Sequence, residues 1–193
     1  FAGAASNVGD VNGDGLADFI ISSGQNSYVV FGTTGNVNIN LGNFATTGAG
    51  FSINTPSGIS GAGDVNGDGL ADLIVGNQGD FSTNTGTAYV VFGKTSNTAV
   101  TVANLAATST GFVINGQVNG DGLGFAVSSA GDVNGDGLAD LVVGGHGGSY
   151  GRTYVVFGKT SASAINLANV AAGGTGGYYI NGASAGDLSG YSV

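Results

Sequence analysis

One ten-residue segment, GDVNGDGLAD, occurs three times in this chain, starting at Gly9, Gly63 and Gly131. Nine of the 12 acidic residues lie in these copies, and all 12 are aspartates. Carboxylates held this close together repel one another, and a bound cation is the most direct way to relieve the repulsion. Any fold for this chain must therefore build the same acidic loop three times.

Within each copy, the pattern D-x-N-x-D-G-x-x-D supplies side-chain oxygens at positions 1, 3, 5 and 9 and a backbone carbonyl at position 7. Hard oxygen ligands at alternating positions suit Ca²⁺, and the glycine at position 6 permits the turn that brings the later ligands back. Mg²⁺ prefers stricter octahedral geometry, and Zn²⁺ prefers His or Cys. We therefore expect about three Ca²⁺ ions, one per loop. The predicted ligands are Asp10, Asn12, Asp14, the Leu16 carbonyl and Asp18 in the first loop, Asp64, Asn66, Asp68, the Leu70 carbonyl and Asp72 in the second, and Asp132, Asn134, Asp136, the Leu138 carbonyl and Asp140 in the third.

The residues after these loops differ from those in better-known calcium loops. An EF-hand has a bidentate Glu at position 12, where this chain has Ile21, Val75 and Val143. A dockerin-type loop leads into a helix, for which ADLIVG is a poor sequence, and the tandem GGxGxD motif of the nonapeptide β-roll is absent. The apolar run after each loop is instead typical of a β-strand.

The acidic loop belongs to a longer repeat. The segment YVVFG comes after it each time, with tyrosines at 28, 89 and 154 that lie 61 and 65 residues apart, and the related segments GFSIN, GFVIN and GYYIN come next, at residues 50, 111 and 177. A unit of this length with four short strands corresponds to one blade of a β-propeller. The three tyrosines are expected to pack between blades.

The expected fold is therefore all-β, with propeller blades of four antiparallel strands, about three blades in this chain and an incomplete ring. Residues 1–45 are predicted to form blade 1 without its first strand, 46–108 blade 2, and 109–174 blade 3. Residues 175–193 are predicted to be the start of a further blade, able to complete blade 1 of another copy. The stretches 102–108 and 164–172 are expected to be outer strands or turns.

Composition narrows the classes of function. The formal charge is −9 with only three basic residues, which argues against nucleic-acid partners and anionic membrane surfaces. No apolar run is long enough to cross a bilayer, so membrane insertion is not expected. The chain has no Cys, no Glu and a single His, and its paired carboxylates lie only in the acidic loops. We therefore expect no catalytic site and no enzymatic activity.

The order of these motifs resembles the FG-GAP repeats of integrin alpha subunits and of many secreted bacterial proteins. The resemblance covers almost the whole chain and implies a β-propeller, seven-bladed in integrins, whose D-x-[DN]-x-D-G-x-x-D loops bind Ca²⁺. Two elements depart from it. The Gly-Ala-Pro element is replaced by Gly76-Asn77-Gln78 and by Gly144-Gly145-His146, and Leu123-Gly124 and Ser189-Gly190 stand in place of Phe-Gly. These departures weaken inferences about a ligand-binding face.

The sequence thus predicts a non-catalytic, calcium-binding, extracellular module for structural assembly, adhesion or ligand binding. The alternative is the propeller portion of a larger secreted enzyme whose catalytic domain lies elsewhere. The expected partners are further copies of the chain or the remainder of a longer propeller, with a protein or carbohydrate ligand. In the self-association hypothesis, Gly190–Val193 of one copy lies beside residues 6–21 of the next.

Three polar residues outside the acidic loops are given simpler interpretations. Asp121 and Asp187 lie in matching turns, GDGLG and GDLSG, and are expected to cap those turns. His146 lies in a glycine-rich loop and is expected to be a surface residue.

Overall fold

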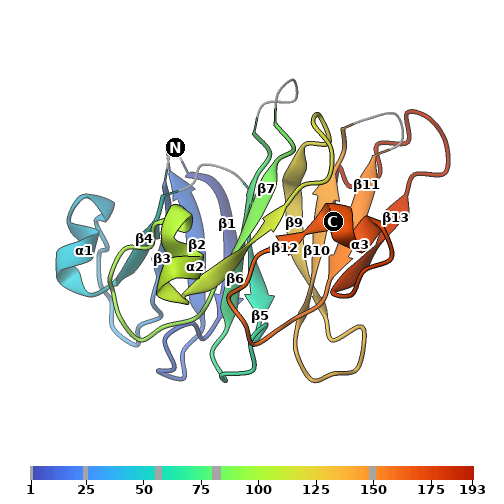
Figure 1. The fold of residues 1–193 in the computed structure, drawn as a ribbon. Helices are drawn as coiled ribbons and strands as arrows, with labels where there is room; N and C mark the ends of the chain where they lie inside the picture. Colours follow the sequence, from blue (N-terminus) through green and yellow to red (C-terminus); the bar gives the residue numbers. More distant parts are fainter. Residues whose placement is uncertain (1, 24–25, 55–57, 80–83, 148–150) are drawn as a thin grey trace.

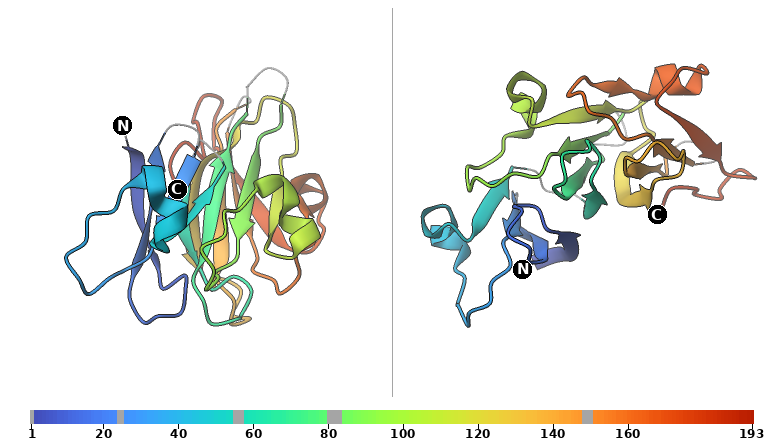
Figure 2. Two further views of the ribbon diagram at one scale, coloured as in Figure 1. Left: turned by 90° about the vertical axis from the view of Figure 1, so that its left-hand side faces the viewer. Right: turned by 90° about the horizontal axis from the view of Figure 1, so that it is seen from below.

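The fold is a row of three β-sheets placed side by side (Figure 1). It is seen in a computed structural model that describes residues 2–23, 26–54, 58–79, 84–147 and 151–193. Seen from below, the sheets succeed one another in an arc, with the short helices on the outer side (Figure 2). Consecutive blades of a β-propeller are arranged in this way.

Each sheet corresponds to one copy of the repeat. Blade 1 consists of β1 (Ala2–Gly9), β2 (Asp18–Ser23), β3 (Asn26–Val30) and β4 (Gly50–Ile53), in that order across the sheet. Blade 2 consists of β5 (Ile59–Gly63), β6 (Asp72–Asn77), β7 (Thr87–Val91) and β8 (Gly111–Asn115). Blade 3 consists of β9 (Leu123–Gly131), β10 (Asp140–Gly145), β11 (Arg152–Val156) and β13 (Gly177–Asn181). All neighbouring strands within these blades are antiparallel.

The blade boundaries predicted from the sequence are wrong by one strand. The GFSIN-type segment was assigned to the start of the following blade, at 46–108 and 109–174. In the structure it is the outermost strand of the preceding blade, because Val29 of β3 pairs with Phe51 of β4. The same pairing joins β7 to β8 and β11 to β13. Blade 1 therefore has all four strands, and 177–181 completes blade 3 rather than starting another blade.

Short helices replace the outer strands or turns expected at 102–108 and 164–172. Each blade has one before its fourth strand: η1 (Leu41–Asn43) and α1 (Phe44–Thr47), η2 (Val102–Asn104) and α2 (Leu105–Thr108), and α3 (Leu167–Ala171), which comes after the two-residue strand β12 (Ile165–Asn166). Asparagine caps two of these turns, since the Asn40 and Asn166 side chains accept from the Gly42 and Ala168 N–H groups. Apolar residues then bury the turn, as Leu105 does in α2.

The core lies between the sheets, so a strand of the middle blade is buried on both faces. In β6, Leu73 and Val75 pack toward blade 1, whereas Ile74 packs toward blade 3, and all three are fully buried. This explains the unbroken apolar run DLIV, which would alternate with polar residues if one face met water. Two of the YVVFG tyrosines pack between blades as expected, because Tyr154 is fully buried and Tyr89 packs on the core between blades 1 and 2. Tyr28 instead contacts Phe44 of its own blade.

Each blade also covers the outer edge of the blade before it. Val100, from the blade 2 connection, forms a parallel bridge with Ile53 at the edge of β4. β12 pairs in parallel with β8 in the same way, through Ile165 and Ile114. Because an uncovered strand edge is a site for pairing with another chain, this crossing segment protects blades 1 and 2.

A lysine from each following blade sits over an aromatic ring of the blade before it. The Lys94 Nζ lies 4.3 Å from the centroid of the Phe51 ring, and the Lys159 Nζ lies 4.5 Å from that of Phe112. Burial lowers the pKa of both lysines. These cation–π contacts explain why Lys-Thr-Ser comes after YVVFG in blades 2 and 3, the two blades that pack behind another.

Candidate metal centres

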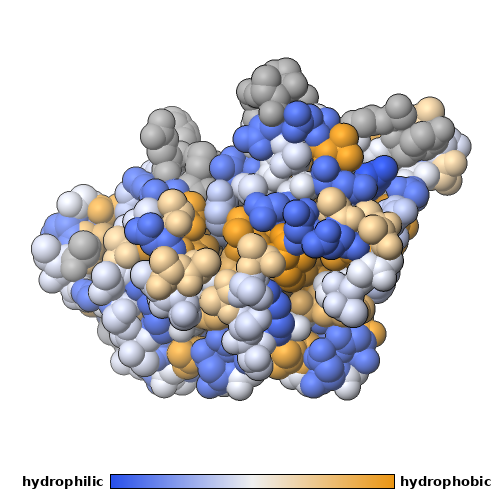
Figure 3. Space-filling view, in the orientation of Figure 1, coloured by the Kyte–Doolittle hydropathy of each residue, from blue (hydrophilic) through white to orange (hydrophobic). Residues whose placement is uncertain are grey.

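The three acidic loops turn at the same end of the sheets, the lower end in Figure 1, and join the first strand of each blade to the second. Hydrophilic residues occupy much of this lower rim (Figure 3). The strand predicted after each loop is confirmed, because β2, β6 and β10 begin at the ninth residue of the motif. All fifteen predicted ligand positions are described, and in each loop hydrogen bonds join position 5 to positions 1 and 3.

The aspartate at position 1 organises each loop by accepting backbone hydrogen bonds. In loop 2, Oδ1 of Asp64 accepts from the N–H groups of Gly67 and Asp68, at 2.7 and 3.1 Å, and Oδ2 accepts from Gly69 at 2.9 Å. Such bonds favour the charged carboxylate. In loop 1, the hydrogen bond from the Gly15 N–H is the main cause that lowers the pKa of Asp10.

Positions 3 and 5 are linked to each other. The Asn66 Nδ2 donates to Oδ2 of Asp68 at 2.9 Å, while Oδ1 of Asn66 accepts from the Asp68 N–H at 2.8 Å. Oδ1 of Asp68 also accepts from the Leu70 N–H at 2.9 Å. These bonds hold both side chains against the backbone of the turn. Asp68 is nevertheless exposed to solvent.

The aspartate at position 9 is buried and ties the loop to the blade. Asp72 is fully buried; its Oδ2 accepts from the Val65 N–H and its Oδ1 from the Gly93 N–H, both at 2.8 Å. Val65 starts the loop and Gly93 ends the YVVFG segment, so one side chain joins three parts of the blade. Asp18 and Asp140 are equally buried and make the equivalent bonds.

The carboxylates within a loop also act on one another electrostatically. The pKa of Asp72 is raised to about 7, mainly by burial; the hydrogen bonds from the Gly93 and Val65 N–H groups lower it, and the charges of Asp68 and Asp64 make smaller raising contributions. Burial likewise raises the pKa of Asp18, with smaller contributions from Asp14 and Asp10. A cation at this point would remove the repulsion and favour the ionised form of the buried aspartate.

The basic residues of the chain contact other groups. The Nζ atoms of Lys94 and Lys159 donate to the carbonyls of Thr98 and Ser163. Arg152 donates to the Gln117 side chain at 2.7 Å. The sequence has only these three Lys and Arg residues. Their side chains therefore do not neutralise the carboxylates of the loops.

The donor set of each loop fits a calcium ion. Among the described residues, no three acidic or imidazole side chains yet surround one point as in a formed metal site, because the carboxylates here face backbone N–H groups. A carboxylate offers about four acceptor positions. Asp64 uses three of its positions and Asp68 two, so each keeps a position for a metal. Positions 1, 3, 5 and 9 and the carbonyl of position 7 would hold the ion, whose chemistry here is charge neutralisation and cross-linking.

Neighbouring loops are joined to each other through the backbone. The Asp10 carbonyl accepts from the Ala71 N–H at 2.9 Å, and the Val11 carbonyl accepts from the Lys94 N–H at 2.8 Å. The same two bonds recur one blade later, from Ala139 to Asp64 and from Lys159 to Val65. The conformation of one loop therefore affects the packing of the next blade.

Two of the repeated units match a known repeat family. A family model for the FG-GAP repeat matches residues 56–91 and 123–160. The chain contains FG-GAP repeats. Each match includes an acidic loop, the strand after it and the YVV strand, so it covers the inner three strands of blades 2 and 3. The FG-GAP assignment predicted from the sequence is thus confirmed. A search of curated proteins found no match.

Blade 1 lies outside the two matched segments but has the same loop geometry. Oδ1 of Asp10 accepts from the Gly13 and Asp14 N–H groups at 2.7 and 3.1 Å, the distances found for the corresponding groups in loop 2. Blade 1 therefore repeats the loop geometry of the two matched units. Among the described residues, no helix has the length and apolar character needed to cross a bilayer.

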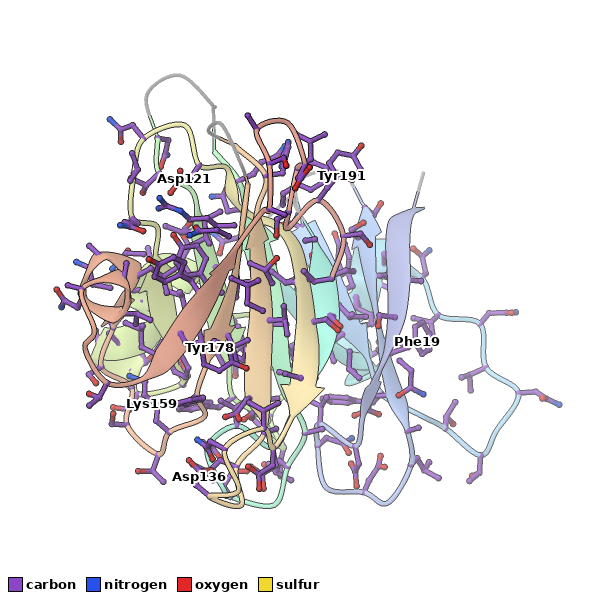
Figure 4. All side chains as sticks on the ribbon, turned by 90° about the vertical axis from the view of Figure 1, so that its right-hand side faces the viewer. Phe19, Asp121, Asp136, Lys159, Tyr178 and Tyr191 are labelled. Carbon is purple, nitrogen blue, oxygen red and sulfur yellow. The ribbon has the colours of Figure 1, made fainter. Side chains whose placement is uncertain are left out.

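The opposite end of the sheets holds polar contacts that the sequence did not predict (Figure 4). Asp187 caps its turn as expected, because its Oδ2 accepts from the Ser184 N–H at 2.6 Å. Asp121 differs: it is buried, and its Oδ2 lies 3.9 Å from the Arg152 guanidinium. It therefore connects the turn before blade 3 to the sheet, a role that its sequence neighbourhood does not reveal.

His146 is not the surface residue that its sequence context indicated. It is partly buried, and its ring centroid lies 4.1 Å from that of Phe125 and 5.4 Å from that of Tyr191. The imidazole thus packs between the start of β9 and the segment after β13. Phe125 and Tyr191 lie far from His146 in the sequence, so the glycines next to His146 do not predict these contacts.

Proposed function

We propose that this chain is a non-catalytic, calcium-binding propeller module that acts outside the cell in structural assembly, adhesion or ligand binding. The observation that carries the proposal is the threefold recurrence of one loop with three aspartates in nine residues. In each copy the first aspartate accepts a hydrogen bond from the backbone of the second, and the third is buried. The FG-GAP repeats support the propeller architecture.

Calcium would act here as a structural cross-link. A metal held by positions 1 to 9 joins the end of the first strand to the start of the second in each blade. Because the loops are hydrogen-bonded to one another, ordering one loop also supports the next blade. An ion that binds the folded state better than the unfolded state stabilises the fold by mass action.

Affinity and concentration favour an extracellular location. Loops of this kind in extracellular modules bind Ca²⁺ with dissociation constants on the order of 0.1 to 1 mM, a range that extracellular calcium saturates. Three ions would also offset much of the net charge of −9. A module of this chemistry is suited to presenting a rigid surface to a protein or carbohydrate partner.

The proposal predicts calcium binding at the acidic loops. Isothermal titration of the metal-free chain should give about three sites, and calcium should raise the melting temperature by about 5 °C or more, as expected for several weak sites filled at once. Asp68→Ala should reduce the stoichiometry by one. Asp187→Ala is the matched control, because Asp187 is also exposed and also accepts a backbone hydrogen bond. An unchanged stoichiometry in Asp68→Ala, or no heat at all with wild type, contradicts the proposal.

A further inference from the structure

Six asparagines of this chain are followed directly by glycine, and three of the six occupy position 3 of the acidic loops. The loop members are Asn12, Asn66 and Asn134, and the others are Asn115, Asn119 and Asn181. We propose that the loop asparagines are self-modification sites, at which the metal-free loop converts the side-chain amide to a carboxylate and bound calcium prevents the conversion. The part played by calcium rests on the proposed function, whereas the reaction itself requires only the loop.

The reaction is an acyl transfer within one Asn-Gly pair. In loop 2, the backbone nitrogen of Gly67 bonds to Cγ of Asn66, the Cγ–Nδ2 bond breaks, and the departing nitrogen leaves as ammonia. The attacking nitrogen gives up its proton, and the departing nitrogen gains one. Water then opens the cyclic imide at either carbonyl, which leaves aspartate or isoaspartate in place of Asn66. Water is thus the only co-reactant.

The attacking nitrogen is hydrogen-bonded to a carboxylate in each loop. In loop 2, the Gly67 N–H donates to Oδ1 of Asp64 at 2.7 Å. The same bond has the same length in loops 1 and 3. A nucleophile is activated by an adjacent base that accepts its proton. The aspartate at position 1 is therefore placed to take the proton from the glycine nitrogen.

The other two reacting atoms of the asparagine side chain also have partners. Oδ1 of Asn66, on which negative charge develops during the attack, accepts from the Asp68 N–H at 2.8 Å. A donor in this place stabilises that charge, as in an oxyanion hole. Nδ2 of Asn66 is the departing nitrogen, and it donates to Oδ2 of Asp68 at 2.9 Å. Because Asp68 is exposed, its carboxylate can pass a proton from solvent to the departing nitrogen.

The three Asn-Gly pairs outside the loops have a different partner at the attacking nitrogen. There the glycine N–H donates to a backbone carbonyl: Gly116 to Gly86 at 3.1 Å, Gly120 to Asn84 at 3.1 Å, and Gly182 to Gly151 at 3.3 Å. A backbone carbonyl accepts a hydrogen bond but, unlike a carboxylate, does not serve as a base. We therefore expect these pairs to react more slowly than those in the loops.

One of these slower sites has the same sequence as the loops. The hexapeptide VNGDGL occurs at 118–123 as well as at 11–16, 65–70 and 133–138. At 118–123, the Asp121 N–H donates to the Val118 carbonyl at 3.2 Å, and Oδ2 of Asp121 lies 3.9 Å from the Arg152 guanidinium. Figure 4 shows Asp121 and Asp136, of loop 3, at opposite ends of the sheets. Because the four hexapeptides are identical, a difference in their rates must come from the fold.

Calcium bound in the loop would block the reaction. The ion would take side-chain oxygens of Asp64 and Asn66 as ligands, and a carboxylate that binds a metal is a weaker base. Coordination would also hold the Asn66 side chain, which must turn its Cγ toward the Gly67 nitrogen to react. The metal-free loop is therefore the reactive form.

The two products have opposite effects on the loop. Aspartate at position 3 keeps the backbone unchanged and adds a charged oxygen ligand for calcium, whose affinity rises with the charge of its ligands. Isoaspartate places the side-chain carbon in the backbone, which lengthens the turn and displaces the N–H groups that Asp64 now holds. A chain that stays without calcium therefore acquires loops of altered affinity.

Mass spectrometry of each Asn-Gly site, after storage of the chain in a chelator, tests the proposal. Loss of the amide at Asn12, Asn66 and Asn134 should be about tenfold or more faster than at Asn119, since a positioned acid or base contributes at least this much. The same chain stored in denaturant gives the baseline, because the four identical hexapeptides should then react at one rate. Loop asparagines that react no faster than Asn119 in the folded chain overturn the proposal.

Asp64→Asn tests the assignment of the proton acceptor. The variant keeps a side-chain oxygen for the Gly67 N–H but removes the base, so Asn66 should slow to about the rate of Asn119. Asn12 and Asn134 of the same molecule are the controls and should keep their rates, which also shows that the variant is folded. An unchanged rate at Asn66 overturns the mechanism, and so does equal slowing at all three loops.

A calcium series separates this proposal from the proposed function. Saturating calcium should lower the loop rates to that of Asn119 or below and should leave Asn119 unchanged. Calcium that binds but does not slow the loops overturns the inference that it prevents the conversion. A chain that binds no calcium in titration contradicts the proposed function, while the comparison in chelator still decides whether the loops react.

Discussion

Replacing Asp72 with alanine is expected to lower the free energy of unfolding by about 3 kcal/mol even without calcium. The substitution leaves the Val65 and Gly93 N–H groups without the carboxylate that they now bond at 2.8 Å. A buried donor that loses its partner costs about 1–3 kcal/mol. Chemical denaturation in the presence of a chelator measures this effect directly, and a loss below about 1 kcal/mol would contradict the structural role.

The comparison with Asp68→Ala separates the role of the loop in anchoring the blade from its role in calcium binding. Asp68 is exposed and its bonds stay within the turn, so its loss should have little effect on the chelated protein and a large one on calcium binding. Asp72→Ala should impair both properties. If the two variants were equally stable in chelator, the buried aspartate would not be the link between loop and blade.

Gly111→Ala is expected to destabilise the chain by about 3 kcal/mol or more, enough to unfold many domains of modest stability. A Cβ at this position would lie 2.0 Å from the Val90 carbonyl oxygen, in a strand pair that the alanine can enter only by separating β7 from β8. A Cβ added at Gly50 or Gly177 would likewise lie 1.9 or 2.1 Å from the Val29 or Val155 carbonyl oxygen. The contact explains why glycine starts the fourth strand of every blade.

Gly137→Ala serves as the control for this prediction. Gly137 has a φ of +88°, but nothing lies within 4 Å of its added Cβ. Its substitution therefore tests backbone strain without a steric clash and should cost about 1 kcal/mol. Thermal and denaturant unfolding of the two variants, compared at the same calcium concentration, should differ by about 2 kcal/mol or more. Equal losses would mean that the close approach of Gly111 to β7 has no energetic weight.

The loops were predictable from sequence because the motif is local. Its nine residues determine most of their own hydrogen bonds: the carboxylate of Asp64 reaches N–H groups three to five residues away. The strands after the loops were predictable for a similar reason, since DLIV has an unbroken apolar pattern. The buried ninth aspartate was predicted as a ligand, whereas its bond to Gly93, 21 residues away, was not.

The assignment of the fourth strand failed because periodicity does not fix pairing. GFVIN begins nearly twenty residues after YVVFG ends, but it ends fewer than ten residues before β9 begins. Distance along the sequence therefore favours the following blade, which is the wrong one. The pairing of Val90 in β7 with Phe112 in β8 shows that GFVIN belongs to the preceding blade. The short helices were missed for a different reason: their stability comes from packing Leu105, Leu167 and Val170, and helices this short have little intrinsic helical tendency.

The shared geometry of the internal interfaces has a consequence for how this chain can change length. A gene segment encoding one whole repeat could be duplicated or deleted in frame, and the flanking units would meet through contacts already in use. Such events need no compensating substitutions at the new junction, because Val65 meets the unit after it just as Val11 does. Recombination between repeats would therefore yield foldable chains of several sizes, and the number of blades could change without any change in the chemistry of the loops.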